Sequence, residues 1–306
     1  MISRRSLRIR VFQFLFSYFK QDPPPSIDFV KQQCLKSLEK TYYFYLLILS
    51  LLDEMRVLET DDIERKKNKF IQKNTEFTPF FTIHPFLITL KEHKPFYQKI
   101  TEYKVNFGND KDWIYSIYRN FRKSELFQTY QESEKSEEHL FECLEMFITD
   151  YLYHNELLEH FFEEQSQFAQ EDLYISLNFV IKNIEEFQNN HTIRIFNLYK
   201  DEKVDKKFVE ELIQYTIQNF KLFDSYIQKY SENWDLDRIN YTDLLLLKMC
   251  LVELIYFPDI PLKTSVDEYI EISKDYSTSQ SYIFINGILV GLIKDLTENG
   301  MIQKTP

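Results

Sequence analysis

Residues 244–255 read Leu244-Leu-Leu-Leu-Lys-Met-Cys-Leu-Val-Glu-Leu-Ile255. Leu244, Leu247, Leu251, Leu254 and Ile255 keep the spacing of one helix face. Pro258 and Pro261 then break the chain, because a proline has no backbone N–H to donate to a helical hydrogen bond. A helix that ends before these prolines is therefore expected here.

Two further helices are expected after this break. Ser265 followed by Glu268 has the spacing of a capping box, and Ser277 followed by Gln280 is a weaker example. The last helix is expected from about 280 to 296 and carries Gly287 and Gly291 one turn apart. Because glycine lowers helix stability, we expect another helix to approach closely at these two positions.

Composition extends the helical prediction to the whole chain. The 306 residues include only 4 Gly and 9 Pro, with no proline between Pro95 and Pro258. Phosphate loops, dinucleotide-binding turns and hairpin-rich β folds need more glycine than this. Helices are expected at 3–20, 27–56 with a charged continuation at 61–72, 111–130, 137–168, 173–187 and 208–230, with a short helix pair at 78–95.

Charge is distributed unevenly. The net charge of −11 excludes a protein that coats nucleic acid over its whole surface. The segment 132–172 has 13 acids and one base, Lys135. The first helix, in contrast, begins with Arg4, Arg5 and Arg8, where the positive end of the helix dipole disfavours cations. Phosphate is a natural group to offset that cost, so we interpret the cluster as a nucleic-acid contact, with a solvated terminus as the alternative.

Other classes of site find little support. The cysteines, Cys34, Cys143 and Cys250, give neither a disulfide framework nor a metal-ligand spacing. His139, His154 and His160 do not form the motif of a di-iron bundle, so a solvated acidic face is expected there. No nucleophile elbow, phosphate loop or zinc pair is present. We therefore predict a protein that is not an enzyme and has no metal or cofactor.

The apolar runs are too short to span a membrane, and we expect no membrane association. The residues after the first arginines imitate a signal peptide, but Gln13, Ser17 and Lys20 interrupt the apolar part, and no small-residue cleavage site follows. We expect a cytoplasmic protein, with secretion as the alternative. The aromatic run from Tyr42 to Tyr45 is expected in the core, the alternative being a stacking platform for bases.

Several C-terminal motifs together resemble the NusB family of transcription antitermination factors. They are, in the family's order and spacing, Asn233-Trp-Asp-Leu-Asp-Arg-Ile239, Val252-Glu-Leu254, Asp259-Ile-Pro261, Val266-Asp-Glu-Tyr-Ile-Glu-Ile-Ser-Lys-Asp-Tyr276 and Phe284-Ile-Asn-Gly-Ile-Leu289. Arg4-Arg-Ser-Leu-Arg8, followed by Gln13-Phe-Leu-Phe-Ser-Tyr18, resembles the family's arginine-rich first helix.

The resemblance implies an all-α fold, a NusB-like helical bundle of two small helical halves with an additional helical insertion. The N-terminal NusB-like helices are expected at 1–58 and the C-terminal half at 204–298, followed by a tail at 299–306. Ordinary members are about half as long as this chain, so 59–203 is expected to be the insertion, with its acidic part at 132–172.

The resemblance also implies a function. Family members bind boxA-type single-stranded RNA of ribosomal RNA operons together with NusE, a ribosomal small-subunit protein, in the transcription elongation complex. Asn286 and Gly287 match structural positions of the family. The family's RNA-binding positions correspond to Arg4, Arg5, Arg8, Arg10, Gln280, Ser281 and Phe284, and its NusE-binding positions correspond to Phe16 and Glu253.

Two other hypotheses remain open. The chain could be a protein-interaction adaptor with a NusB-like fold and weak RNA affinity, which docks a basic partner on its acidic insertion. A related fold also serves as the N-terminal module of RNA cytosine methyltransferases, but we expect no methyltransferase domain here.

Overall fold

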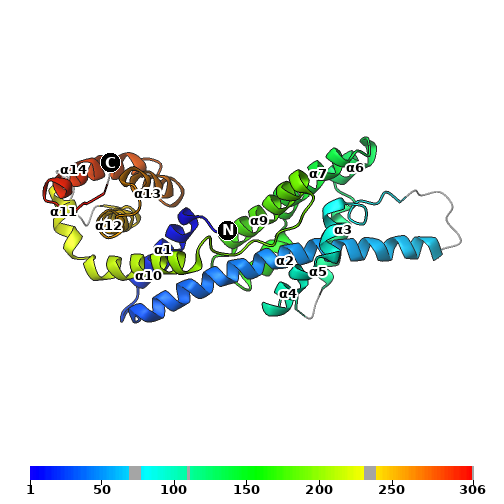
Figure 1. Cartoon of the computed structure of the whole chain (residues 1–306), viewed down its shortest axis with the longest axis horizontal. Coiled ribbons are helices and arrows are strands. Elements are labelled where there is room, and N and C mark those ends of the chain that lie inside the picture. Colours follow the sequence, from blue (N-terminus) through cyan, green and yellow to red (C-terminus); the bar gives the residue numbers. More distant parts are fainter. Residues whose placement is uncertain (69–76, 109–110, 231–238, 305–306) are drawn as a thin grey trace. The chain divides into compact units, whose positions relative to one another are not determined.

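The computed structural model describes residues 1–68, 77–108, 111–230 and 239–304, and these residues form helices and no strands (Figure 1). The predicted all-α fold is therefore confirmed. The motif residues 233–238 lie outside the described residues. The helices are α1 (Arg4–Tyr18), α2 (Ile27–Asn68), α3 (Pro85–Glu92), α4 (Lys94–Glu102), α5 (Asp112–Phe121), α6 (Glu125–Glu132), α7 (Glu137–Met146), the π-helical turn η1 (Phe147–Leu152), α8 (Glu156–Glu163), α9 (Ala169–Asn190), α10 (Glu202–Asn219), α11 (Leu222–Tyr230), α12 (Tyr241–Tyr256), α13 (Leu262–Tyr276) and α14 (Ser281–Glu298).

The chain divides into two compact units. The central unit consists of Met1 and Ser37–Leu198, and the terminal unit consists of Ile2–Lys36 and Tyr199–Pro306. The division falls within α2, so this helix contributes residues to both units. None of the helices within the described ranges combines the length and apolar composition that a membrane crossing needs.

The terminal unit is built around α12. This helix packs against α1, α10, α13 and α14, and Figure 1 shows it end-on, with α10, α11, α13 and α14 around it. The predicted helix is present, and its residues from Leu245 to Leu254 are all buried. Lys248 is buried among them, and its charge is compensated. Its Nζ forms an ion pair with Asp224 at 2.5 Å and lies 3.4 Å from the ring centroid of Phe220.

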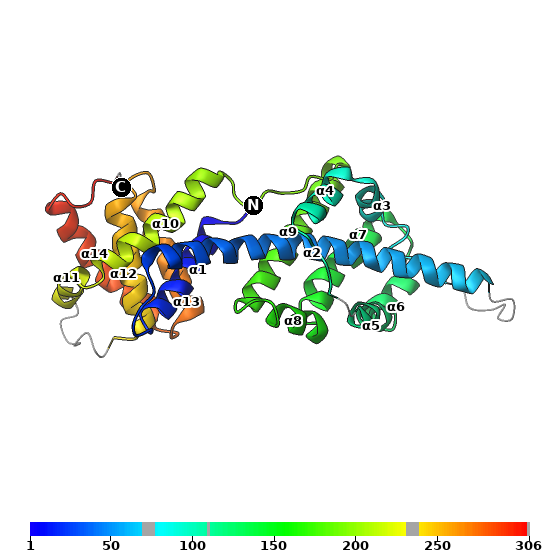
Figure 2. The same cartoon turned by 90° about the horizontal axis from the view of Figure 1, so that it is seen from below.

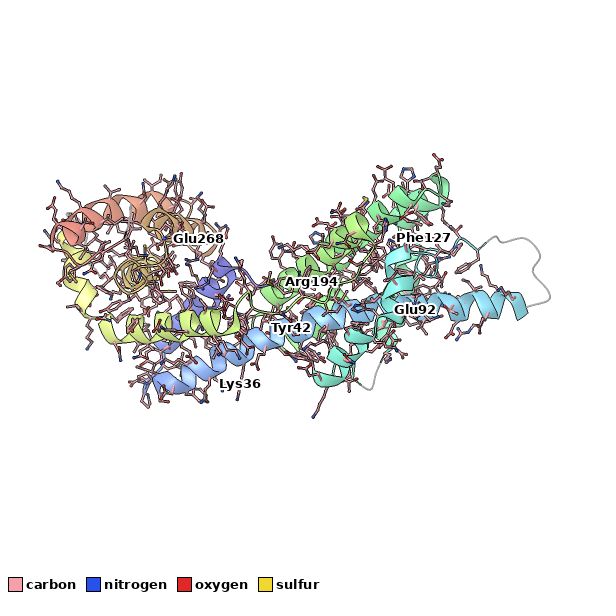
Figure 3. All side chains as sticks on the ribbon, in the orientation of Figure 1. Lys36, Tyr42, Glu92, Phe127, Arg194 and Glu268 are labelled. Atoms are coloured by element: carbon pink, nitrogen blue, oxygen red, sulfur yellow. The ribbon has the colours of Figure 1, made fainter. Side chains whose placement is uncertain are left out.

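The central unit has an aromatic core. Figures 1 and 2 show α3 to α9 gathered around residues 37–68 of α2. Phe121 packs against Phe147 with ring centroids 4.5 Å apart, and Phe44 of α2 stacks on Phe162 of α8 at 4.0 Å. Tyr42, which is labelled in Figure 3, and Tyr45 are also buried. The aromatic run therefore belongs to the core, as predicted.

The acidic segment does not form the single helix predicted over 137–168. It forms α7, η1 and α8 instead, and α8 starts afresh where the side chain of Asn155 accepts the backbone N–H of Leu158 at 3.2 Å. The apolar stripe that suggested this helix is buried nonetheless, except for the half-buried Tyr151; it consists of Leu140, Leu144, Phe147, Tyr151, Leu158 and Phe162. The helices predicted over 111–130 and 208–230 are each divided in two, the first at Ser124, which caps α6.

Both predicted capping boxes are wrong. Helix α13 begins at Leu262, one turn before Ser265, and its N-cap is Pro261, which has extended backbone and forms no side-chain capping bond. Helix α14 begins at Ser281 without a side-chain cap. The close approach predicted at the glycines holds at Gly291, where a β-carbon would overlap the ring of Tyr230, but is wrong at Gly287, where such a carbon would have no described atom within 4 Å.

Candidate nucleic-acid interface

Three arginines at the start of α1 each meet a carboxylate of the terminal unit. Arg4 Nε lies 3.0 Å from Asp205. The guanidinium of Arg5 donates two hydrogen bonds to Glu268, at 2.9 and 3.2 Å, and these raise the pKa of Arg5; Figure 3 labels Glu268. These carboxylates offset the cost of placing cations at the positive end of the helix dipole. The inference that an external phosphate must do so therefore needs correction.

Arg8 and Glu253 form a buried ion pair. Arg8 is 2% exposed and Glu253 is fully buried, and two hydrogen bonds of 2.7 and 2.8 Å join them. The hydroxyl of Tyr269 donates a further bond to Glu253 at 3.2 Å. Burial alone would lower the pKa of Arg8, but the hydrogen bonds and charge of Glu253 raise it above its ordinary value. Neither side chain is accessible to a ligand at the surface, and both belong to the core.

Arg10 also lies in the core. Its side chain is 1% exposed. Burial raises the pKa of the Cys34 thiol, and the positive charge of Arg10 opposes this effect. Four arginines were predicted to bind RNA, and two of them are substantially exposed to solvent. These are Arg4 and Arg5, whose side chains are 37% and 44% exposed. The predicted cationic surface is therefore reduced from four side chains to two.

Three other predicted residues meet in one pocket. Gln280, Ser281 and Phe284 line a pocket of about 280 Å³ at the start of α14. Ile239 and Phe284 supply its apolar walls, and an amide is available from Gln280. The remaining lining residues are Asn240, Asp243 and Thr278.

The buried carboxylate of Asp243 organises this pocket. It accepts hydrogen bonds from the hydroxyls of Ser277 at 2.5 Å and Ser281 at 2.8 Å. These bonds tie the start of α14 to α12, since Asp243 belongs to the first turn of α12. Sequence reasoning missed Asp243, because a carboxylate in the first turn of a helix is common and does not by itself indicate a buried hydrogen-bond acceptor.

The arginines and the pocket do not share one cavity. Helices α1 and α13 run in parallel, because Arg5 meets Glu268 and, further along, Phe12 meets Tyr276 with ring centroids 5.4 Å apart. From Glu268 to Tyr276 the helix rises by roughly 12 Å at 1.5 Å per residue. A ligand that contacts both places must therefore extend along α13.

A second groove lies beside Phe16. This side chain is 36% exposed and packs edge-on against Tyr241, with ring centroids 5.3 Å apart. Tyr241 also lines an aromatic groove of about 460 Å³ together with Tyr18, Phe19, Pro24, Ile217 and Phe220. Of the two predicted partner-binding residues, Phe16 therefore reaches the surface next to a groove, whereas Glu253 does not reach the surface.

The predicted structural role of Asn286 and Gly287 is wrong. Both residues are exposed on α14. No group of three or more histidine, cysteine or acidic side chains that could hold a metal ion occurs among the described residues.

Comparisons with known proteins single out one family. The family model described as "NusB family" matches residues 176–294, a range that includes the whole pocket at the start of α14. The transcription antitermination protein NusB of Salinibacter ruber is 40% identical over 100 residues, which are 33% of this chain and 62% of that protein. The NusB of Chloroherpeton thalassium is 37% identical over 100 residues, 33% of this chain and 47% of that protein.

A third relative is covered more completely. The NusB of Thermodesulfovibrio yellowstonii is 35% identical over 119 residues, which are 39% of this chain and 74% of that protein. A solved structure of T. maritima NusB is 25% identical and covers 54% of this chain and 93% of that chain, with a TM-score of 0.30.

Proposed function

The chain belongs to the NusB family, and on that premise we propose that it is an RNA-binding transcription antitermination factor. In this proposal it acts with NusE on boxA-type single-stranded RNA of ribosomal RNA operons, in the cytoplasmic transcription elongation complex. Residues 59–203 are then an insertion into the family fold, between the N-terminal helices at 1–58 and the C-terminal half at 204–298.

The pocket at the start of α14 carries the proposal. Single-stranded RNA is held mainly by bases that stack on aromatic side chains and form hydrogen bonds with their edges. Phe284 is half-buried and lines the pocket, so part of its ring is open to a base that enters there. Gln280 is exposed beside it and can donate to, and accept from, the edge of a base. A volume of about 280 Å³ accommodates one such ring.

Arg4 and Arg5 support the proposal as phosphate contacts. Both side chains are partly exposed, and the pair of Arg5 with the partly exposed Glu268 is worth only about 0–1 kcal/mol. A phosphate can therefore replace Glu268 at a small free-energy cost, whereas the buried Asp205 keeps the backbone N–H groups of Lys200 and Asp201 as donors when Arg4 turns to a phosphate. The distance along α13 means that an RNA strand that reaches both arginines and the pocket must extend over several nucleotides.

Phe16 and the neighbouring groove support a protein partner. An exposed aromatic side chain beside a groove lined by Tyr18, Phe19 and Phe220 has the character of an interface anchor. In the proposal this is the surface that NusE covers. Glu253 stabilises the surface from the core, through Arg8, and does not contact the partner directly.

A substitution in the pocket tests the proposal. Phe284→Ala removes a stacking contact worth about 1–3 kcal/mol, so we expect the Kd for a boxA-type RNA to rise about 5-fold to 150-fold. Phe284→Tyr keeps the ring and should restore binding. The matched control is Tyr174→Ala, which removes an exposed ring from α9 of the central unit and should leave the Kd unchanged. Equal affinities for the wild-type and Phe284→Ala chains would contradict the proposal.

A further inference from the structure

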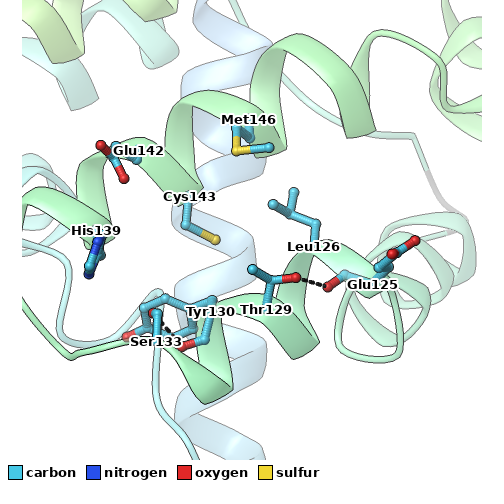
Figure 4. A pocket seen from close by; sticks show the side chains of 9 residues that line it. All are labelled: Glu125, Leu126, Thr129, Tyr130, Ser133, His139, Glu142, Cys143 and Met146. Carbon is cyan, nitrogen blue, oxygen red and sulfur yellow. Dashed lines mark hydrogen bonds between the residues drawn. The ribbon is translucent and has the colours of Figure 1, made fainter.

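The central unit has a groove between α6 and α7 that the RNA site does not use. Figure 4 shows its lining side chains, and its volume is about 530 Å³. Leu126 and Tyr130 of α6 face Cys143 and Met146 of α7 across it. Met146 is 47% exposed although it is apolar. The groove therefore offers an uncovered apolar floor, which is characteristic of interaction surfaces.

The polar groups within the groove are largely satisfied by their own helices. The hydroxyl of Thr129 donates to the backbone oxygen of Glu125 at 3.0 Å, and that of Ser133 donates to the backbone oxygen of Tyr130 at 2.9 Å. Burial raises the pKa of the Cys143 thiol to about 12, so the thiol is neutral and behaves as a small apolar group. Recognition in this groove therefore depends on apolar contact and on the charges around it.

Those charges are negative. Residues 125–146 include seven glutamates and one base. That base, Lys135, donates to the backbone oxygen of Tyr130 and lies 4.2 Å from the centre of its ring. Glu125 and Glu142 line the groove itself and are exposed. Among the residues that the structure describes, neither of these two carboxylates forms an ion pair, so both are available to a cationic ligand.

We propose that this groove binds an amphipathic helical segment of a protein partner, with a row of large aliphatic side chains flanked by lysine or arginine. The aliphatic row would cover Leu126 and Met146, and the cations would pair with Glu125 and Glu142. RNA is a poor occupant because its phosphates would meet these carboxylates. A second copy of this chain is also a poor occupant, because association would bring together two chains of net charge −11. All of these residues lie outside 176–294, so the proposal does not depend on the RNA site.

A synthetic peptide provides the probe. The probe is an 18-residue fluorescein-labelled peptide with leucine and lysine at helical spacing, and its anisotropy is followed as the full chain is added. One control peptide replaces every lysine with glutamate, and another replaces every leucine with serine. We expect each control peptide to bind at least tenfold more weakly than the probe.

Two double variants with the same net charge locate the binding site. Glu125→Lys with Glu142→Lys reverses the groove charges, and Glu163→Lys with Glu185→Lys reverses two exposed charges on α8 and α9. We expect the first pair to raise the Kd for the probe at least tenfold and the second to raise it less than threefold. Met146→Asn, at an exposed position, removes apolar contact without adding a charge and should also raise it at least tenfold.

Three results would overturn the proposal. An equal loss in the two double variants would mean that the probe responds only to net charge. Equal binding of the serine peptide would mean that the apolar floor is not used. A wild-type dimer that Met146→Asn converts to a monomer, measured by light scattering, would mean that a second copy of the chain occupies the groove.

Discussion

Replacement of Arg8 by alanine should destabilise the terminal unit without acting on RNA directly. In this variant the buried carboxylate of Glu253 keeps only the hydroxyl of Tyr269 as a described hydrogen-bond donor. Removal of one member of a buried ion pair typically costs about 3–5 kcal/mol. Burial lowers the pKa of Lys304, and the charge of Glu253 opposes this effect, so Lys304 offsets part of the loss of Arg8. We therefore expect a loss of about 3 kcal/mol, a large fraction of the roughly 5–15 kcal/mol by which proteins are stable.

A double variant separates the loss of stability from a loss of RNA contact. Arg8→Met combined with Glu253→Leu replaces the pair by apolar side chains of similar size, which is often nearly neutral for stability. The hydroxyl of Tyr269 then loses its acceptor, which costs about 1–3 kcal/mol. The expected order of stability is wild type, then the double variant, then Arg8→Ala.

Urea unfolding followed by circular dichroism measures these differences, and hydrogen exchange in α12 locates them. With a typical slope of about 1–3 kcal/mol per molar urea, the Arg8→Ala midpoint should fall by on the order of 1–3 M. The reasoning is refuted if Arg8→Ala unfolds within about 1 kcal/mol of the wild type and nevertheless loses RNA binding. That result would mean that Arg8 leaves the core to contact RNA.

Three more substitutions test other parts of the account. Glu268→Gln removes the charged partner of Arg5 and should raise RNA affinity by about 1.4-fold to fivefold in an anisotropy titration, since such a pair is typically worth about 0.2–1 kcal/mol; a lower affinity would mean that Arg5 does not contact phosphate. Gly291→Ala should lower the melting temperature because of the overlap with the facing tyrosine ring, whereas Gly287→Ala, in open space, should raise stability by about 0.5–1 kcal/mol; the opposite order would contradict the described packing. Burial lowers the pKa of His84 to about 3 from the ordinary 6.5, so the folded state favours the neutral form of the imidazole. The stability that His84 contributes is therefore present above pH 6.5 and is lost as the pH falls from 6.5 toward 3. His84→Asn, which keeps an acceptor for the α3 cap, should unfold with a shallower pH dependence in that window, and identical pH profiles would contradict this assignment.

The sequence predicted the helical elements well because their signals are local. The apolar row around Leu247 identifies α12, and the arginine-rich start of α1 is also correctly placed. Helix ends were less reliable, because several residues compete to start a helix. Asn155 followed by Glu156 and Leu158 is a good N-terminal signal, yet the continuous apolar stripe on both sides concealed it.

The site was predictable only in part, since its decisive contacts join residues far apart in the chain. One short segment at the start of α14 contains Gln280, Ser281 and Phe284. Because these residues are close in sequence, a match to the family motif identified all three of these pocket residues at once. Arg8 and Glu253 are separated by 245 positions, and no spacing in the sequence indicates that they pair. Whether an arginine points to the surface or into the core depends on such partners, and a motif match does not report them.

The most direct measurement is a titration of a fluorescent boxA-type RNA with the full chain and NusE at two salt concentrations. The wild type is compared with Arg4→Gln/Arg5→Gln, a change that leaves Asp205 with the backbone N–H groups of Lys200 and Asp201 as donors. The account predicts at least tenfold weaker binding and a slope of log K against log salt that is smaller by about 1.4, or 0.7 for each lost phosphate contact. Unchanged affinity and an unchanged slope would contradict the assignment of this end of α1 to RNA.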